Sequence, residues 1–576
     1  MKNVARNRWK AVSLLLVAGA AALTVAGCGS SSAGASSANA ASVSASTALQ
    51  TTSGVPASGS NTPTRGGTIN VAWEQEPPCL YGEWVQIGYL SQQYLEELVA
   101  SGPKGSVVPW LATSWKVSNS GKTYTFQIRP NVKFTDGTPL TAQAVVDNFN
   151  SWFTSNPATY NGYAESEIGD VYKNAVATGP LTVQVNLNQP YYYLLSVLSQ
   201  YAMGIQSPKA MSRGATAECQ DPVGTGPFTV VKWNHGVDVI LKRNPNYNSW
   251  PADAVHKGPA YVNGIVWKFI ADDTTRYASL ESGENDVVYN VPAVDWASAH
   301  QSYQVLQYNT GGNPYRLQLA TQWGPFTSLQ VRQAFAYGMN RPQAVAAAYL
   351  GSREYNGNGA LGASTPTYDA ALANNYAYNP AEANKLLNEA GWTGRNAQGY
   401  RTKDGKELTI VLPYGLDMNV TQDDLSFFQI IQQEEKRVGF NLVLQSVPPA
   451  TFFSSGAGWP GIKDKFNVLP WYWVGRTPDA MHVVWAPTIQ GQPNVNNVTG
   501  YQTPQLASLI TDLDSTSSAT LRQKYSYEIQ NLVVKNALAL GISPLEVNLA
   551  VTPKLHDVWL RDDVGEPVFS DAYFSK

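Results

Sequence analysis

The sequence is poor in charge, and its net charge is close to zero. Charged residues make up 14% of the 576 residues, and 39 Lys and Arg are nearly balanced by 42 Asp and Glu, which leaves a formal net charge of -3. A surface this close to neutral offers no electrostatic attraction for a phosphate backbone. We therefore expect no nucleic acid among the partners of this protein.

Catalytic and metal-binding motifs are also missing. The sequence has neither a Gly-x-Ser-x-Gly turn nor a His-Glu-x-x-His pair, and the adjacent carboxylates of Asp272 and Asp273 diverge rather than form an acid–base pair. The five histidines are scattered without metal-ligand spacing: His235, His256, His300, His482 and His556. The sequence predicts a protein that is not an enzyme and carries no metal or other cofactor.

Only three cysteines are present, and the first lies in an N-terminal leader. Basic residues within positions 2–10 precede an apolar run at 11–25 that is too short to span a membrane comfortably. Small residues stand directly before Cys28, as in a lipoprotein cleavage box. We interpret residues 1–28 as a lipoprotein signal peptide and Cys28 as the lipidated residue; the alternative is an ordinary secretory signal with a chance cysteine.

The other two cysteines, Cys79 and Cys219, lack the spacing of a zinc site or a redox dithiol. Outside the cytoplasm, in an oxidising compartment, two remaining cysteines often pair. A disulfide between Cys79 and Cys219 is the expected arrangement, and two isolated buried thiols are the alternative.

Residues 29–65 contain almost nothing but Ser, Ala, Gly, Thr and Pro, with no aromatic residue and no charge before Arg65. Such a composition cannot bury a core. A flexible chain of this length has a reach of about 30 Å. We predict a disordered tether that holds the folded part of the protein near a membrane surface.

Aromatic side chains are abundant, with 17 Trp and 31 Tyr. The roughly 510 residues after the tether are too many for one core and predict two or three domains. Their most informative stretch is 109–142. Alternating residues predict a hairpin with its turn at 119–122, a second turn follows at 136–137, and Thr141 is placed to cap a helix that begins at Ala142.

Residues 109–142 closely resemble the hallmark of the family 5 extracellular solute-binding proteins, the peptide- and nickel-type receptors of ABC importers. Other segments match the same family in the same order: an opening strand at 66–73, a Gly-Thr-Gly crossing at 223–228 and a helix at 331–341. Alternating helix and strand patterns continue beyond 379, which indicates a second α/β lobe. The resemblance extends from residue 66 to the C-terminus.

This resemblance implies an α/β, two-lobed periplasmic-binding-protein-like fold (type II, cluster C) with an extra small domain inserted in lobe I. Lobe I would comprise residues 66–100, 221–312 and 542–576, the inserted subdomain residues 101–220, and lobe II residues 313–541. The ligand is then expected in the cleft between the lobes, which close around it.

Residues 468–479 are the richest candidate for ligand contact. Peptide receptors of this family carry an Asp three residues after a Trp on this strand, where it holds the α-ammonium of the peptide; counting from Trp473 reaches Arg476 instead. A guanidinium suits a carboxylate, a phosphate or a carbonyl-rich ligand rather than an ammonium. Asp479 replaces the missing acid only if the loop is arranged differently.

Three aromatic residues are further candidates. Trp471 and Trp473 suit stacking on rings or peptide planes, but successive residues of a strand face opposite ways, so Tyr472 cannot share their surface; we favour Trp473 for the cleft. Tyr193 is placed to reach the cleft, although such tyrosines more often pack structurally. Dipeptide receptors also place an arginine before the helix expected at 425–438, whereas residues 416–419 offer no cation.

Together these features predict an extracytoplasmic substrate-binding lipoprotein of an ABC importer, a monomer held at the cell envelope by its lipid anchor. It would capture a peptide or oligopeptide-like solute and deliver it to a permease and ATPase complex in the membrane. The alternatives are the same role for an oligosaccharide, a carboxylated compound or a nickel chelate, and a ligand-sensing lipoprotein without transport.

Overall fold

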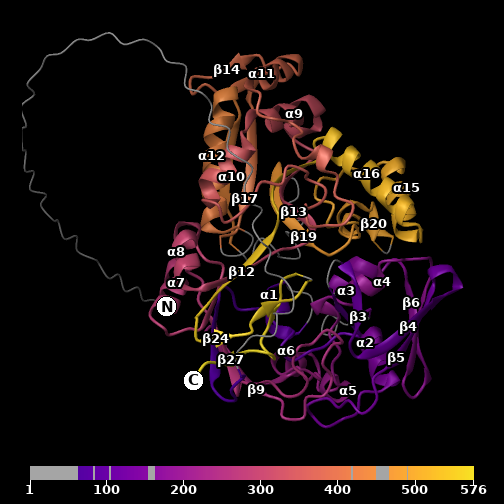
Figure 1. Cartoon of the computed structure of the whole chain (residues 1–576). Coiled ribbons are helices and arrows are strands. Elements are labelled where there is room, and N and C mark those ends of the chain that lie inside the picture. The colour runs from indigo at the N-terminus through magenta and orange to yellow at the C-terminus, as the bar shows by residue number, and fades with distance from the viewer. Residues whose placement is uncertain are drawn as a thin grey trace, which may run out of the picture. The chain divides into compact units, whose positions relative to one another are not determined.

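The computed structural model describes residues 62–576, except for 82–84, 103–104, 154–161, 417–419, 449–465, 490 and 563. The predicted signal peptide, Cys28 and most of the predicted tether lie outside the described residues. The described part is an α/β structure whose largest sheets have seven and four strands (Figure 1). Of its two three-stranded sheets, the one of order β19-β13-β22 is called the three-stranded sheet below. No helix in this part is both long and apolar enough to cross a membrane.

The seven-stranded sheet is built from both ends of the described chain. Its strand order is β12-β23-β11-β1-β10-β9-β8. The central strand β1 is parallel to both of its neighbours, and the successive residues Val71, Ala72 and Trp73 on it are at most 1% exposed, as expected of a strand covered on both faces. The strands are β1 Thr68–Trp73, β8 Phe228–Asn234, β9 Asp238–Arg243, β10 Gly264–Phe269, β11 Val287–Tyr289, β12 Gln304–Asn309 and β23 Glu546–Val551.

The four-stranded sheet contains the hairpin predicted from the sequence. Trp115 lies opposite Phe126 across the turn Asn119–Gly121, and Thr141 Oγ1 accepts a hydrogen bond from the Ala144 N–H at 3.1 Å to cap α2. The order is β4-β5-β7-β6, with strands β4 Ala112–Ser118, β5 Thr123–Ile128, β6 Tyr172–Gly179 and β7 Thr182–Leu187, and α2 (Ala142–Trp152) packs on β6.

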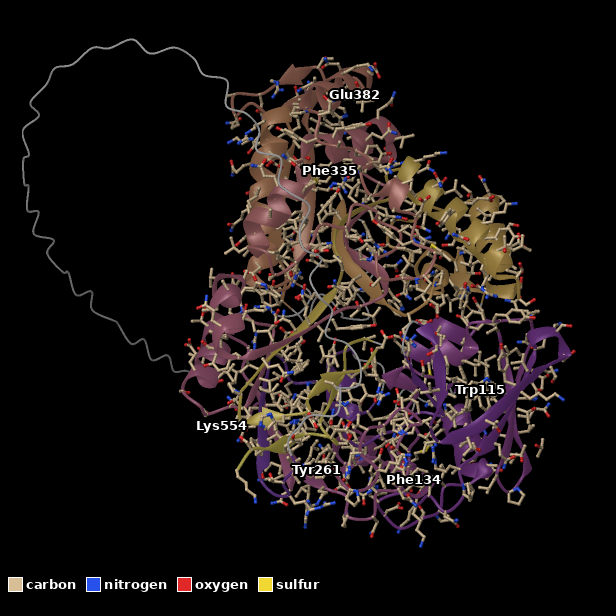
Figure 2. The ribbon with its side chains drawn as sticks, viewed as in Figure 1. Trp115, Phe134, Tyr261, Phe335, Glu382 and Lys554 are labelled. Carbon is tan, nitrogen blue, oxygen red and sulfur yellow. A yellow bond between two sulfur atoms is a disulfide. The ribbon has the colours of Figure 1, made fainter. Side chains whose placement is uncertain are left out.

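The three-stranded sheet, of order β19-β13-β22, belongs to the second half of the chain. Its central strand β13 is buried along its whole length, and Phe335 lies in the adjoining hydrophobic core (Figure 2). The strands are β13 Gly312–Leu319, β19 Val468–Val474 and β22 Ala539–Ser543, followed in the same region by the parallel pair β17 Thr409–Tyr414 and β18 Asn441–Ser446.

The longest helices also lie in this second half. The helix expected at 425–438 begins earlier, at Gln422, because Thr421 and Asp424 exchange hydrogen bonds of 2.8 and 3.2 Å in a capping box. The helices here are α9 Leu329–Gly338, α10 Arg341–Tyr349, α11 Pro380–Glu389, α12 Gln422–Val438, α14 Ala480–Trp485, α15 Pro504–Ser515 and α16 Ala519–Lys535. Earlier in the chain are α1 Val85–Ser91, α3 Gly162–Ile168, α4 Leu194–Val197, α5 Pro208–Met211, α6 Ala215–Gln220, α7 Asp273–Glu281 and α8 Trp296–Ser302.

Gly226 lies where the chain crosses the backbone of Tyr94. Its N–H donates to Tyr94 O at 3.1 Å, and a Cβ added to Gly226 would lie 2.7 Å from Tyr94 Cα. The Gly-Thr-Gly sequence is therefore explained by close backbone packing, without a phosphate ligand.

Gly226→Ala should lower the free energy of unfolding by about 1–3 kcal/mol, because the added methyl group forces two backbone segments apart. Gly179→Ala is the matched control, since the nearest atom to its added Cβ is 3.4 Å away. Urea denaturation of both variants measures the effect, and equal stabilities would contradict the crossing.

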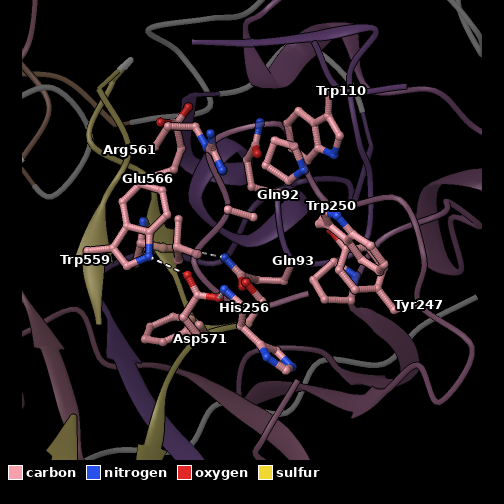
Figure 3. A pocket seen from close by; sticks show the side chains of 17 residues that line it. Gln92, Gln93, Trp110, Tyr247, Trp250, His256, Trp559, Arg561, Glu566 and Asp571 are labelled. Atoms are coloured by element: carbon pink, nitrogen blue, oxygen red, sulfur yellow. Dashed lines mark hydrogen bonds between the residues drawn. The ribbon is translucent and has the colours of Figure 1, made fainter. Parts of the chain in front are cut away.

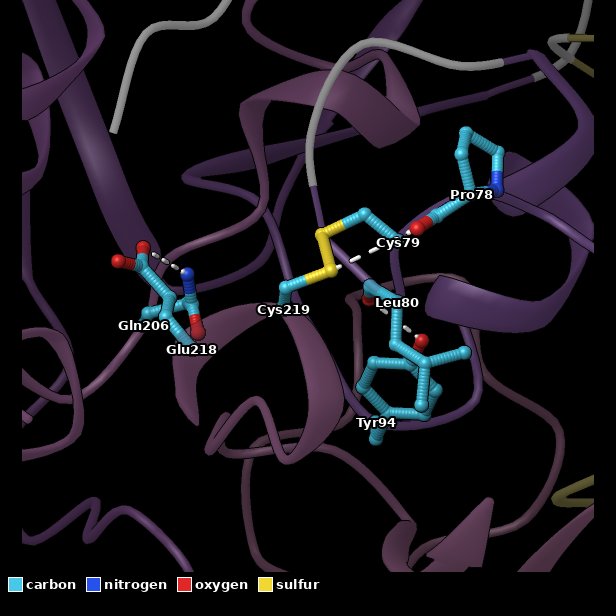
Figure 4. Close-up of a disulfide and its surroundings, with 7 residues drawn as sticks. All are labelled: Pro78, Cys79, Leu80, Tyr94, Gln206, Glu218 and Cys219. Atoms are coloured by element: carbon cyan, nitrogen blue, oxygen red, sulfur yellow. Dashed lines mark hydrogen bonds between the residues drawn. A yellow bond between two sulfur atoms is a disulfide. The ribbon is translucent and has the colours of Figure 1, made fainter. Parts of the chain in front are cut away.

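Cys79 and Cys219 are joined in a disulfide (Figure 4). The two residues are 140 positions apart, and the Leu80 N–H donates to Cys219 O at 2.9 Å beside the bond. The four-stranded sheet lies in the stretch of chain between them. The disulfide therefore ties the start of that stretch to its end.

Candidate functional site

One pocket is lined by residues that follow or lie on strands of both the seven-stranded and the three-stranded sheet. Glu74 follows β1 and Tyr289 ends β11, whereas Tyr315 lies on β13 and Tyr472 on β19. The pocket contains about 570 Å³ of empty space, counting its open mouth. We call it the cleft pocket, and its lining is Glu74, Asp273, Tyr289, Asn290, Tyr315, Arg353, Val420, Thr421, Asp424, Tyr472, Leu545 and Glu546.

Tyrosine side chains form much of its wall. The ring centroids of Tyr315 and Tyr472 are 6.4 Å apart, and Tyr289 stacks on Trp73 at 4.0 Å. Burial raises the pKa of all three tyrosines above its usual value, so their hydroxyl groups stay protonated. The pocket therefore offers flat apolar faces with hydroxyl donors at their edges.

Arg353 supplies the positive charge of the cleft pocket. Its Nη1 lies 2.9 Å from Asp424 Oδ1, which also accepts a hydrogen bond from the Tyr349 hydroxyl at 2.7 Å. Burial lowers the pKa of Arg353, but the Asp424 carboxylate outweighs this and the net shift is upward. Residues 416–419 contain no cation in the sequence. Arg353, from a distant segment, places one at the start of α12.

The remaining acids of the pocket are in different states. Burial raises the pKa of Glu546 to about 8, although Arg353 opposes the shift, so this carboxyl keeps its proton at neutral pH. Asp273 is paired with Arg276 at 2.7 Å. The pocket therefore presents both a protonated acid and paired carboxylates, a donor and acceptor set suited to holding a polar solute.

Trp473 belongs to a different contact. Its Nε1 donates to Glu167 Oε1 at 2.9 Å, and its ring stacks on Tyr163 with centroids 5.6 Å apart. Beside them, His482 Nδ1 lies 2.7 Å from Asp514 Oδ2. This contact joins α3 to β19, α14 and α15, and we call its ionisable residues the His482 cluster: Glu167, Asp479, His482 and Asp514.

Asp479 and Tyr193 both lie next to this contact. Asp479 is 1% exposed and caps α14, with Oδ1 accepting from the Ala480 N–H at 3.0 Å and from the Thr477 hydroxyl at 2.6 Å. Tyr193 is buried at the start of α4, where burial and then Asp514 and Asp479 raise its pKa. Three residues predicted for the ligand site are thus brought together, around a histidine that sequence reasoning had set aside.

Three residues of the His482 cluster, Glu167, Asp479 and His482, have raised pKa values. Burial would lower the pKa of His482, but the ion pair with Asp514 raises it to about 9. Burial, followed by repulsion from Asp479, raises the pKa of Glu167 to about 8, and burial raises that of Asp479 to about 7. Despite these acids, no group of three or more ligating side chains in the described ranges could hold a metal ion.

Arg476 is bonded within the protein. It is 4% exposed; Nη2 donates to Gly102 O at 2.6 Å, Nη1 donates to Ser106 O at 3.0 Å, and Asp562 Oδ2 lies 3.3 Å from Nη2. Carbonyl oxygens accept these hydrogen bonds, as expected for a guanidinium, but they belong to the protein backbone and not to a ligand. Arg476 thereby fastens the end of β19 to two other segments.

Trp471 packs beside a small apolar cluster that includes Ala320 and Leu469, and its ring stacks on that of Tyr472 with centroids 5.8 Å apart. As far as the structure describes the cleft pocket, its lining includes none of the five side chains singled out from the sequence, Tyr193, Trp471, Trp473, Arg476 and Asp479. The side chain between the two tryptophans, Tyr472, lines it instead.

A second cavity, of about 500 Å³, is walled by Trp110, Tyr247, Trp250 and Trp559 (Figure 3). The Arg561 guanidinium lies 5.1 Å from the Trp110 ring and 5.2 Å from the Trp559 ring. The lining residues fall within 92–256 and 559–571, outside the three-stranded sheet and its helices. We therefore take the cleft pocket as the candidate site.

This α/β chain, with its pocket lined from two sheets, has the fold of the two-lobed periplasmic binding proteins. NikA from Brucella suis in complex with Fe(III)-EDTA superposes with a TM-score of 0.75 at 23% identity, covering 88% of this chain and 100% of that one. The oligopeptide-binding protein AppA from Bacillus subtilis, in complex with a nonapeptide, gives 0.74 at 20% identity, covering 89% and 100%.

The family model of bacterial extracellular solute-binding proteins, family 5 Middle, matches residues 106–494, and the chain belongs to this family. It is 29% identical over 359 residues to the nickel-binding periplasmic protein of Escherichia coli K12, covering 61% of this chain and 65% of that protein. It is 31% identical over 290 residues to the glutathione-binding protein GsiB of Shigella flexneri serotype 5b, covering 49% and 53%. The matched segments thus span between half and two thirds of these relatives.

Proposed function

We propose that this protein is the extracytoplasmic receptor of an ABC importer, anchored by a lipid on Cys28, and that it captures a peptide-like solute in the cleft pocket. The observation that carries the proposal is the lining of that pocket from both sheets. A solute that contacts Glu74 on one side and Tyr472 on the other favours the state in which the two sides are close. Such a receptor binds and releases its cargo unchanged and hands it to a permease and ATPase.

The domain limits inferred from the sequence support a two-part receptor. Lobe I (66–100, 221–312 and 542–576) contains all strands of the seven-stranded sheet. Lobe II (313–541) contains the three-stranded sheet to within two residues at either end. In this division the cleft pocket lies where the lobes meet.

The position of β19 supports a peptide as the cargo. This strand is at the edge of its sheet, and residues 471–473 on it are partly exposed whereas the rest of the strand is buried. An extended peptide pairs with a strand edge and places alternate side chains in separate pockets. Tyr472, which lines the cleft pocket, offers one such side-chain surface beside this edge. The relatives named for glutathione, and the solved relative with a nonapeptide, point to the same class of solute.

Tyr472→Ala should weaken solute binding about 10- to 100-fold, because it removes a central aromatic contact. Mass spectrometry of the solute that co-purifies with the full chain identifies the probe, and titration calorimetry with that compound measures the affinity. Tyr378→Ala is the matched control, since Tyr378 is 39% exposed and outside the pocket.

Each other outcome has a definite meaning. Equal affinity of the Tyr472→Ala variant and the wild type would exclude the cleft pocket. A co-purified oligosaccharide or metal chelate would replace the peptide as cargo and leave the receptor role intact. Chemical turnover of the co-purified compound would contradict the receptor role itself.

A further inference from the structure

Arg316 is a fully buried arginine whose guanidinium is largely unpaired. It lies on the central strand β13 and has 0% exposure. Nη1 donates to Gly359 O at a long 3.3 Å, and within the described part of the chain Nε and Nη2 have no hydrogen-bond partner. A buried charge without partners is costly, so such N–H groups usually meet an acceptor in the working protein.

Other buried arginines of this chain show what is normal here. Arg276 donates to four backbone carbonyls and to the Asp273 carboxylate. Arg401 donates to three backbone carbonyls and to the side chains of Asn384 and Asn388. The deficit at Arg316 is therefore a local property of its surroundings.

The surroundings of Arg316 hold donors rather than acids. The guanidinium carbon lies 5.5 Å from the ring centroid of Trp485 on α14, and in the described structure Trp485 Nε1 also has no partner. Burial lowers the pKa of Arg316 to about 9, and no described acid opposes this shift. Arg316 is still charged at neutral pH, and an incoming anion meets no competing carboxylate.

The strand register places Arg316 next to the edge strand of its sheet. Arg316 pairs with Trp471 on β19, which is the edge strand and partly exposed at this residue. Side chains of a strand stand roughly perpendicular to the sheet, so the guanidinium lies on the face of the sheet that carries α14, beside Trp485.

We propose that Arg316, together with Trp485, forms a binding site for a carboxylate group. A planar carboxylate matches the two unpaired N–H groups of the fork in a bidentate contact. The carboxylate has two sources: a small free carboxylate ion, or the carboxylate of the captured solute. The second source rests on the proposed function, whereas the first does not.

The first test compares thermal unfolding of the full chain in sodium acetate and in sodium chloride, at pH 7 and equal ionic strength. The wild type should gain about 2 °C or more in acetate. Arg316→Met should lose this gain and be at least as stable as the wild type in chloride, because an unpaired buried charge has been removed. Arg341→Met is the matched control: Arg341 donates to Gly541 O at 3.0 Å and Asn375 O at 2.8 Å, so this variant should lose stability but keep the acetate gain.

The second test separates the two sources with trialanine and its C-terminal amide. If the solute provides the carboxylate, Arg316→Met lowers the affinity for trialanine at least 10-fold and leaves the affinity for its C-terminal amide unchanged. If neither peptide binds while the acetate gain persists, the site takes the free ion, and only the proposed cargo is contradicted.

The proposal is overturned if acetate stabilises Arg316→Met as much as the wild type. It is also overturned if acetate has no effect on the wild type and Arg316→Met is destabilised, since Arg316 would then be a structural residue. Should Arg316→Met fail to fold, Arg316→Lys keeps the charge and loses the fork. An unreduced acetate gain in that variant would equally reject the site.

Discussion

His482→Ala is expected to lower the free energy of unfolding by about 3–5 kcal/mol at pH 7. The substitution leaves the Asp514 carboxylate buried without its cation, and an uncompensated buried charge is strongly destabilising. Asp514 is most affected, because it lies 2.7 Å from His482 and is 3% exposed. Urea denaturation measures the loss.

The pH dependence of this loss identifies its cause. The pKa of His482 is raised to about 9 in the folded protein, so its contribution is complete below about pH 6.5 and is lost as the pH rises through 9. The raised pKa values of Glu167, about 8, and Asp479, about 7, also destabilise the wild type, progressively as the pH rises from about 4, where the unfolded carboxyl groups ionise, to about 8. Asp170 and Tyr191 also face the imidazole ring of His482.

The difference between the wild type and His482→Ala should therefore be largest near pH 6, shrink as the pH rises from about 6.5 to 9, and be nearly gone above pH 9. His300→Ala is the control, since His300 is exposed and contacts the Trp296 carbonyl of its own helix at 2.9 Å. A difference that stays constant from pH 6 to 10 would show that His482 acts through packing alone.

Arg476→Asp is expected to destabilise the protein by about 3–5 kcal/mol rather than to redirect it toward amine-bearing solutes. The change removes charge-assisted hydrogen bonds to Gly102 O and Ser106 O and sets a second carboxylate beside Asp562. The end of β19 then loses its attachment to both segments. The affinity for the solute should also fall, because Tyr472 lies on the same strand.

Thermal unfolding and solute titration of Arg476→Asp check this expectation. Arg437→Asp, a change of the same charge at an exposed position near the end of α12, should cost less than about 1 kcal/mol. A stable Arg476→Asp protein that binds amines more tightly than the wild type would mean that Arg476 turns toward the solute.

Local features of the fold could be predicted from the sequence because their causes lie within a few residues. The hairpin at 112–128 follows from period-two alternation and a turn, and Thr141 caps α2 where its side chain and position predict. The start of α12 was placed three residues late, since apolar periodicity begins at Leu425 whereas the capping box begins at Thr421.

The candidate site could be predicted only in part, because its chemistry depends on pairs that are distant in sequence. Arg353 and Asp424 are 71 residues apart, and Glu167 and Trp473 are 306 apart. An unusual residue at 476 was visible, but its partners include backbone carbonyls, which every residue carries and no sequence pattern marks. Strand alternation predicted opposite faces for Tyr472 and Trp471, whereas their rings stack with centroids 5.8 Å apart, and nothing in the sequence indicated that Tyr472 lines the pocket.

The Cys79–Cys219 bond has a consequence for proteolysis. A protease that cuts once between residues 80 and 218 breaks the main chain but releases no fragment, because the two pieces remain covalently joined through the sulfur atoms. Such a nicked molecule keeps its mass, apart from one added water, until a thiol is added. Damage to this stretch would therefore leave every strand of the seven-stranded sheet on one covalent molecule.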